Sequence, residues 1–293
     1  MSVGMVVARL VLRVRPMTLR TAETARRSAV DSVDEMPSRR LRRRFRFERH
    51  LRRGRTVITV APLGDAGGPE ILYLHGGAYV HGMVGILWSL VADLVKRTGA
   101  TVTVPLYRLA PKAGADSEYP FLASLLHELQ ERADRGVVVA GDSAGAGLAL
   151  GLAIQARDEG TRPPAALLLF SPWVDVTMTN PAIADVASKD LILGLDGLAW
   201  SGRAWAGARD LTDPMISPLH DSLAGLPPMH IHQGDRDILR PDAELFAAKA
   251  RRAGTECSLH LYRGAFHDFV GVPYLPESRK ALADAARVVA NAG

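Results

Sequence analysis

The stretch that most restricts the fold of this chain is the pentapeptide Gly-Asp-Ser-Ala-Gly at residues 141–145. It follows the run Gly-Val-Val-Val-Ala at 136–140, which is typical of a strand buried on both faces, and it precedes a helix-forming segment at 144–154. Glycines on both sides of the serine allow the chain to turn sharply, so Ser143 is expected at the tip of a strand-to-helix turn with its hydroxyl exposed. This arrangement predicts a serine nucleophile. The alternative is that the serine only caps an ordinary helix start.

From Arg55 onward, short apolar runs alternate with amphipathic segments. The expected strands are 56–61, 71–75, 101–105, 137–140, 166–170, 229–233 and 258–262, and most are apolar without alternation. The expected helices are 86–97, 121–132, 144–158, 242–253 and 277–292. Such alternation predicts an α/β fold with a mostly parallel central sheet flanked by helices.

The first 54 residues are expected to be a charged, helical segment that forms a cap, with the catalytic domain spanning residues 55–293. An insertion around 175–215, where the alternation lapses, contains Trp200 and Trp205 and is expected to add a helix over the sheet edge and the substrate groove.

Arginines are concentrated at residues 38–55. They are interpreted as a solvated basic helix face, although such a run could also hold phosphates or an anionic membrane. The chain carries no nucleic-acid-binding motif, so no nucleic-acid partner is expected.

The composition is that of a globular protein, with 47% hydrophobic and 23% charged residues and a net charge of +5. The single cysteine, Cys257, rules out an intramolecular disulfide and is expected to be a buried thiol, without a cluster at zinc-binding spacing. Arginines interrupt the apolar segment at 5–15 too early for a signal peptide, and no apolar run of about 20 residues exists to span a membrane. A cytoplasmic location without stable membrane insertion is therefore expected, with peripheral contact through an amphipathic N-terminus as the alternative.

A His-Gly-Gly run at 75–77 directly follows an expected strand. Consecutive glycines there let backbone N–H groups face an open site, where they can stabilise the negative oxygen of a tetrahedral intermediate. The expected donors are the N–H groups of Gly76, Gly77 and Ala144. The alternative is a tight turn that needs glycine for its backbone alone.

A serine hydroxyl needs a base, and that base needs an orienting carboxylate. His267 lies after the last expected strand and before the last helix, where a loop can bring it to Ser143. Asp235 and Asp237 follow the preceding strand, and either could be a turn former instead. The order serine, acid, histidine is the one that α/β-hydrolases use.

Taken together, these motifs resemble the hormone-sensitive-lipase-like (bacterial family IV) carboxylesterases over roughly residues 56–290. The motifs that carry the resemblance are His-Gly-Gly at 75–77, Tyr-Arg-Leu-Ala-Pro at 107–111, Gly-Asp-Ser-Ala-Gly at 141–145, Ser-Pro-Trp-Val-Asp at 171–175, Ser-Pro-Leu at 217–219 with Leu-Pro-Pro at 226–228, and Gly-Ala-Phe-His-Asp-Phe at 264–269. The resemblance implies an α/β-hydrolase fold with a helical cap.

The resemblance also implies the triad Ser143, Asp237 and His267, because the family's acid lies two residues before a leucine, here Leu239. Asp235 remains the second choice. Asp142 is interpreted as structural, bonding neighbouring loops without joining the chemistry. The chain departs from the family at two positions: Lys112 replaces a glutamate and is followed by extra residues, and Ala78 replaces a glycine.

The function implied is hydrolysis of short-acyl esters, from acetyl to about hexanoyl, through an acyl-enzyme. No metal or organic cofactor is expected, and the partner is a small-molecule ester. The resemblance also allows a homodimer through the last strand and helix. The alternative function is removal of N- or O-acetyl groups from a specialised metabolite. A third interpretation, a non-catalytic small-molecule receptor, is disfavoured because Ser143, Asp237 and His267 are all retained.

Overall fold

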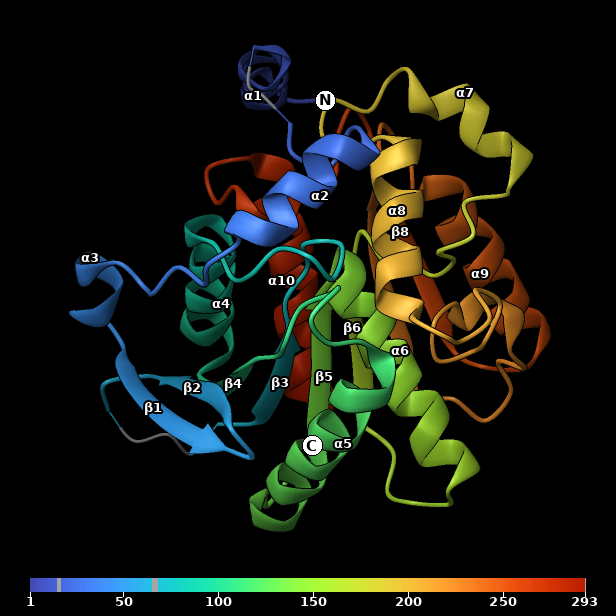
Figure 1. The fold of residues 1–293 in the computed structure, drawn as a ribbon. Coiled ribbons are helices and arrows are strands. Elements are labelled where there is room, and N and C mark those ends of the chain that lie inside the picture. The colour runs from blue at the N-terminus through green and yellow to red at the C-terminus, as the bar shows by residue number, and fades with distance from the viewer. Residues whose placement is uncertain (15–16, 65–67, 293) are drawn as a thin grey trace.

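The computed structural model describes residues 1–14, 17–64 and 68–292, which form a central sheet with helices on both faces (Figure 1). The strands are β1 (Arg46–Arg52), β2 (Arg55–Ala61), β3 (Glu70–Leu74), β4 (Thr101–Leu106), β5 (Val137–Asp142), β6 (Ala166–Phe170), β7 (Met229–Gly234) and β8 (Cys257–Tyr262). The helices are α1 (Val3–Arg13), α2 (Ala22–Asp31), α3 (Arg39–Arg42), α4 (Gly85–Thr98), α5 (Ala115–Arg132), α6 (Ser143–Asp158), α7 (Ala184–Ala187), α8 (Leu195–Ala206), α9 (Arg240–Arg252) and α10 (Pro276–Asn291).

The strand order across the sheet is β1-β2-β4-β3-β5-β6-β7-β8. All neighbours from β4 to β8 pair in parallel, whereas β1 and β2 add an antiparallel edge. Parallel strands place their carboxyl ends at one edge of the sheet, so the loops after β3, β5, β7 and β8 meet there. The expected mostly parallel sheet is confirmed.

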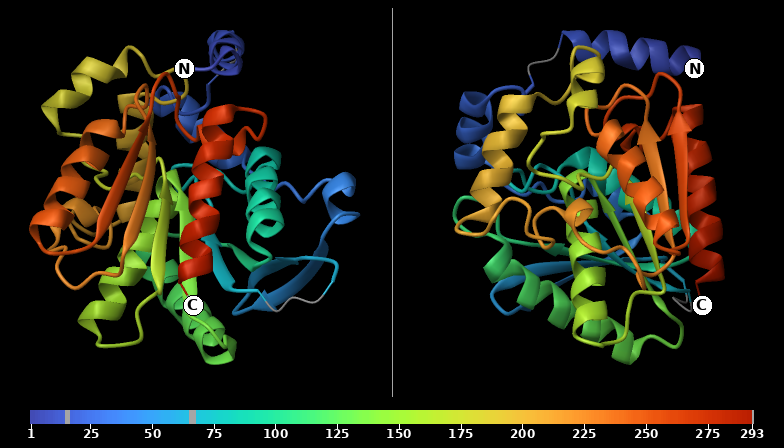
Figure 2. Two further views of the ribbon diagram at one scale, coloured as in Figure 1. Left: turned by 180° about the vertical axis from the view of Figure 1, so that it is seen from behind. Right: turned by 90° about the vertical axis from the view of Figure 1, so that its right-hand side faces the viewer.

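Two apolar cores lie on opposite faces of this sheet. One contains side chains of α5, α6 and α9, and the other contains side chains of α4 and α10. The two views of Figure 2 show these helices on either side of the strands. Strands β5 and β6 are buried along their whole length, which explains why their sequences are apolar without alternation.

The seven expected strands and the five expected helices are all present, with ends that differ by a few residues. The helical interpretation of the first 54 residues is wrong for residues 46–52, which form β1 and pair with β2 in an antiparallel hairpin. Charged residues occupy four of the seven β1 positions, three of them arginines, and β1 is an edge strand with largely exposed side chains. Charged side chains suit such an edge because they discourage pairing with a second chain.

Helices α1, α2, α7 and α8 lie above the carboxyl ends of the strands (Figure 1). Helix α2 packs against α8, which is the helix expected around Trp200 and Trp205. The backbones approach closely there, since a Cβ on Gly197 would lie 2.1 Å from the carbonyl oxygen of Leu19. The N-terminal segment and the 175–215 insertion therefore form one layer over the site.

Cys257 is buried, as expected, and burial raises the pKa of its thiol to about 11. Among the described residues, none of the helices is long and apolar enough to cross a membrane.

Candidate active site

Ser143 lies at the turn between β5 and α6 and has a φ of +50°, in the left-handed region that residues other than glycine rarely adopt. The turn requires glycine beside it, because a Cβ on Gly145 would lie 2.0 Å from the carbonyl oxygen of Leu74. This contact seats α6 directly on β3. The helix-capping interpretation of Ser143 is wrong, since the N-cap residue of α6 is Asp142 and Ser143 is the first helical residue.

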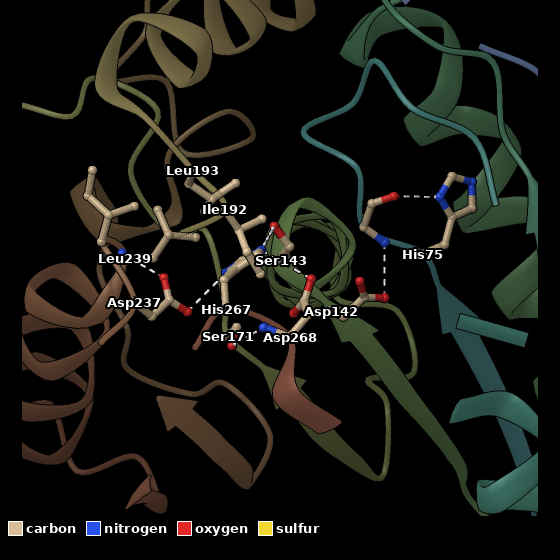
Figure 3. Close-up of polar contacts among 12 residues, drawn as sticks. His75, Asp142, Ser143, Ser171, Ile192, Leu193, Asp237, Leu239, His267 and Asp268 are labelled. Carbon is tan, nitrogen blue, oxygen red and sulfur yellow. Dashed lines mark hydrogen bonds and ion pairs between the residues drawn. The ribbon is translucent and has the colours of Figure 1, made fainter. Parts of the chain in front are cut away.

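His267 follows β8 and lies between Ser143 and Asp237 (Figure 3). Its Nε2 is 3.0 Å from Ser143 Oγ, and its Nδ1 is 2.9 Å from Asp237 Oδ2. The other oxygen of Asp237 accepts a hydrogen bond from the Leu239 N–H at 2.9 Å, which fixes the carboxylate. Asp235 lies apart from the histidine and accepts a bond from the Gly264 N–H. The side chains of Ser143, His267 and Asp237 thus form one chain of hydrogen-bond contacts.

A second carboxylate, not singled out from the sequence, contacts the same histidine. Asp268 Oδ2 lies 3.1 Å from His267 Nε2, the nitrogen that also faces Ser143. Asp268 has a φ of +53°, and its N–H donates to Ser171 Oγ, so this backbone is held in place (Figure 3). Burial by itself lowers the pKa of His267, but the carboxylates of Asp268 and Asp237 outweigh burial and raise that pKa well above its ordinary value.

The turn at 75–77 has a different hydrogen-bond pattern from the one expected. The Gly76 N–H donates to Asp142 Oδ1 at 3.0 Å, so it is not free to bind a substrate oxygen, which corrects its expected role. The N–H groups of Gly77 and Ala78 donate no hydrogen bond to any described residue. As the second residue of α6, Ala144 has no intrahelical partner for its N–H. Free donors therefore remain at three positions beside Ser143.

Asp142 has the bonding role that was expected of it. Its Oδ1 accepts bonds from the Gly76 N–H and from the Tyr73 hydroxyl, so it connects β5 with β3 and the following turn. Burial, followed by the nearby Asp268 carboxylate, raises the pKa of Asp142 well above its ordinary value. A side chain on Gly76 would collide with Asp142, since its Cβ would lie 2.2 Å from Oδ2.

His75, another residue outside the sequence expectations, stiffens the same turn. Its ring stacks on Tyr107 with centroids 4.3 Å apart, and its Nδ1 lies 2.7 Å from the Gly76 carbonyl oxygen. The Tyr107 hydroxyl donates to the His75 carbonyl oxygen at 2.8 Å. The loop at 107–111 is therefore one support of the turn.

A pocket of about 470 Å³ opens above Ser143 and His267. Its walls are mainly apolar, and many of them come from the segment before β1 and from the 175–215 insertion: Val7, Ala8, Val11, Leu12, Leu19, Ile192 and Leu193. The insertion that was expected over the groove lines it through Ile192 and Leu193, whereas Trp200 and Trp205 are not among the described lining residues. Trp205 is buried and stacks on Tyr79 with centroids 4.5 Å apart, so it contributes to packing beneath the pocket wall and not to the wall itself.

Asp190 connects the pocket wall to the acid loop, a role that local sequence does not signal. Its Oδ1 accepts from the N–H groups of Ile192 and Leu193, and its Oδ2 accepts from the Ile238 N–H at 2.8 Å. Burial, with a contribution from Asp237, raises the pKa of Asp190 to about 6. In the described ranges, no three acidic, histidine or cysteine side chains are placed to hold a metal ion.

Comparisons with known proteins agree with this geometry. A family model described as the alpha/beta hydrolase fold matches residues 71–271. LipR of Mycobacterium tuberculosis, a candidate acetyl-hydrolase, is 36% identical over 82% of this chain and 78% of its own length. An esterase of Acinetobacter venetianus is 32% identical over 74% of this chain and 73% of its own length. The crystal structure of EstE5 soaked with p-nitrophenyl butyrate superposes with a TM-score of 0.84 at 27% identity, covering 100% of this chain and 99% of that one.

Proposed function

The chain belongs to the hormone-sensitive-lipase-like carboxylesterases of the α/β-hydrolase fold, and from this premise we propose that Ser143, His267 and Asp237 hydrolyse short-acyl esters. The observation that carries the proposal is the contact of Ser143 Oγ with His267 Nε2 at 3.0 Å, with Asp237 on the opposite ring nitrogen. The pair has the geometry of a nucleophile and its general base.

In the proposed mechanism, neutral His267 accepts the proton of Ser143 at Nε2 while Oγ attacks the ester carbonyl carbon. The resulting oxyanion receives hydrogen bonds from the N–H groups of Gly77 and Ala144, and the free N–H of Ala78 takes the place first expected for Gly76. The imidazolium then gives its proton to the departing alkoxide, which leaves as the alcohol. Asp237 stabilises the imidazolium through Nδ1. Water, deprotonated by the same Nε2, cleaves the acyl-enzyme and releases the acid.

The preferred substrates are esters of acetyl to about hexanoyl groups. The pocket's size and its apolar lining suit a small uncharged acyl group, and the described residues that line it include no lysine or arginine to pair with a carboxylate-bearing substrate. The structural similarity to EstE5, which was soaked with a butyrate ester, supports the same size range.

The test compares p-nitrophenyl acetate, butyrate, octanoate and laurate as substrates of the native protein and of Ser143→Ala. We expect the highest kcat/KM on the short esters and loss of nearly all activity in the variant. Ser89→Ala is the matched control, because the Ser89 hydroxyl bonds the Gly85 carbonyl oxygen on α4, outside the pocket, and this variant keeps native rates. Rates that rise through laurate would contradict the short-acyl preference, and an active Ser143→Ala would contradict the nucleophile.

A second candidate function is hydrolysis of an acetyl group on a specialised metabolite. The 36% identity to LipR, a candidate acetyl-hydrolase, favours it. The same triad serves both reactions, so the two candidates differ only in substrate. Acetate release from an O-acetylated and an N-acetylated version of one sugar separates them, since only a deacetylase cleaves the amide at a rate comparable with the ester.

We further propose that the segment before β1 and the 175–215 insertion act together as the cap.

A homodimer through β8 and α10 remains a proposal. Light scattering on the purified protein measures its mass in solution and so distinguishes a monomer from a dimer.

A further inference from the structure

Helix α1 is fixed to the catalytic domain along one face. Met5 is fully buried and Ala8 nearly so, and both belong to the core that also contains α10 side chains. Ser2 binds the Glu277 carboxylate through its backbone N–H at 2.7 Å and its hydroxyl at 2.8 Å. Because a helix of this length is marginal on its own in water, these contacts determine both its formation and its orientation.

The opposite face of α1 is apolar as well, and it is open to solvent. Val3, Val7, Leu10 and the C-cap residue Val14 recur at the spacing of one helix face, and their side chains are 81, 53, 54 and 83% exposed. Val6 and Val11 widen the strip on either side. No charged residue interrupts this strip, which we call the outer face of α1. A soluble helix normally places polar side chains in such a position, so the outer face is an exposed patch that calls for a partner.

The outer face is continuous with the mouth of the active-site pocket. Val7 and Val11 line the pocket and are also about half exposed, so one side of the mouth is formed by α1. Ile86 and Tyr274 form exposed parts of the same lining, at 47 and 63%. The apolar rim and the outer face together make one surface around the opening through which a substrate enters.

The N-terminal segment that carries the outer face is basic. Residues 1–22 include arginines at positions 9, 13, 15 and 20 and no aspartate or glutamate. Arg9 and Arg13 lie on α1 beside the apolar strip. This combination matches an anionic lipid surface, into which the apolar strip can insert while the arginines meet the phosphates. A second copy of the chain suits it less well, since a two-fold contact through the outer face would bring the arginines of the two α1 helices together.

We propose that the outer face of α1 and the apolar rim dock the protein on an anionic lipid–water interface, with the pocket mouth against the lipid. Docking needs only the surface residues, so it does not depend on the proposed hydrolysis. Together with that hydrolysis, it would let esters dissolved in the lipid phase reach Ser143 without crossing water.

The test measures co-sedimentation of the full-length protein with vesicles of phosphatidylcholine alone and of phosphatidylcholine mixed with phosphatidylglycerol. The native protein is expected to bind the mixed vesicles more tightly, with binding weakened by salt. The double variant Val3→Ser, Leu10→Ser removes two outer-face side chains that do not line the pocket. It should bind the mixed vesicles at least about tenfold more weakly, from the apolar area lost.

Leu51→Ser is the matched control, because Leu51 is also a largely exposed apolar residue. It lies on β1, the edge strand of the sheet, which is far from helix α1 (Figure 1). It should bind as the native protein does, and both Leu51→Ser and the double variant should hydrolyse dissolved p-nitrophenyl butyrate at native rates. Ser143→Ala should bind vesicles normally, which separates failure of docking from failure of the proposed hydrolysis. The proposal is overturned if the double variant binds like native protein, if Leu51→Ser loses binding equally, or if light scattering shows a native dimer that the double variant lacks.

Discussion

At the scale of single residues, the chemistry of this site depends on three groups that contact one imidazole ring. Asp237 binds Nδ1 of His267, whereas Ser143 and Asp268 both lie within 3.1 Å of Nε2. A carboxylate at Nε2 favours the protonated ring, and the base has to be unprotonated to accept the proton of Ser143. Asp268 therefore opposes the start of the reaction and stabilises the imidazolium that forms during it.

The first prediction concerns the pH dependence of Asp268→Asn. Removing this negative charge lowers the pKa of His267, which the two carboxylates raise in the native protein. Because activity appears as the ring loses its proton, the acid limb of kcat/KM should move to lower pH in the variant. Profiles of p-nitrophenyl acetate hydrolysis measure this, with Ser171→Ala as a control that removes the bond to the Asp268 N–H but keeps the charge. A shift toward higher pH would contradict the prediction.

The second prediction separates the two aspartates after β7. Asp237→Asn should lower kcat by about 10⁴-fold, because the amide no longer favours the ring tautomer that presents Nε2 to Ser143. Asp235→Asn should keep most of its activity, since its side-chain oxygen still accepts from the Gly264 N–H. Single-substrate kinetics with butyrate esters measure both. Equal losses in the two variants would show that Asp235 supports catalysis as well.

At the scale of elements, one buried ion pair secures the loop at 107–111 that supports the turn at 75–77. The Arg55 guanidinium on β2 donates to both oxygens of Glu118 on α5, and Glu118 also accepts from the Arg108 N–H. Arg108 follows Tyr107, which stacks on His75. Glu118 lies in the stretch after Lys112 where the chain departs from the family pattern. Local support in that stretch thus comes from a carboxylate that no family motif indicated.

The third prediction is that Glu118→Ala destabilises the protein by about 3 kcal/mol or more, because the Arg55 charge and the Arg108 N–H lose a buried partner. Glu118 is fully buried, whereas Glu128, which pairs with Arg52 at 3.6 Å, is half exposed. Glu128→Ala should change the free energy of unfolding by less than about 1 kcal/mol. Denaturant titrations of both variants measure the difference. Similar losses for the two would rule out a special role of the Arg55–Glu118 pair.

At the scale of the whole molecule, stability is expected to be greatest in the middle of the sheet. Strands β5 and β6 are buried on both faces and bonded on both edges, whereas β1 is bonded only to β2 and exposes most side chains. Ser143 is attached to this rigid centre, whereas the segment before β1 and the 175–215 insertion cover the site from the periphery. The residues proposed for catalysis are thereby held firmly, while many pocket walls belong to less protected elements.

The fourth prediction is an order of amide hydrogen exchange. Peptides from β5 and β6 should exchange only on global unfolding, while peptides from β1 and α1 should exchange much sooner through local opening. Exchange followed by mass spectrometry measures the order. Exchange of β5 at the rate of β1 would contradict it.

Much of the fold could be predicted from the chain because its signals are local. Continuous apolar runs such as 166–170 mark strands covered on both faces, and glycines flanking Ser143 mark the turn. The β1 strand was missed because its side chains are mostly charged and lie at an exposed edge, where burial imposes no apolar pattern. Local propensity was therefore a poor guide in residues 46–52.

The sequence by itself determined the fold class, the position of Ser143 at the turn after β5 and the histidine that follows the last strand, since each depends on short-range sterics and chain order. Only the tertiary structure decided that Asp237 and not Asp235 contacts His267, that Asp268 contacts Nε2, and that the Gly76 N–H is bonded to Asp142. It also decided that α1, and neither tryptophan of α8, lines the pocket. These outcomes depend on contacts between residues far apart in the chain, whose distances and directions are fixed when the elements pack.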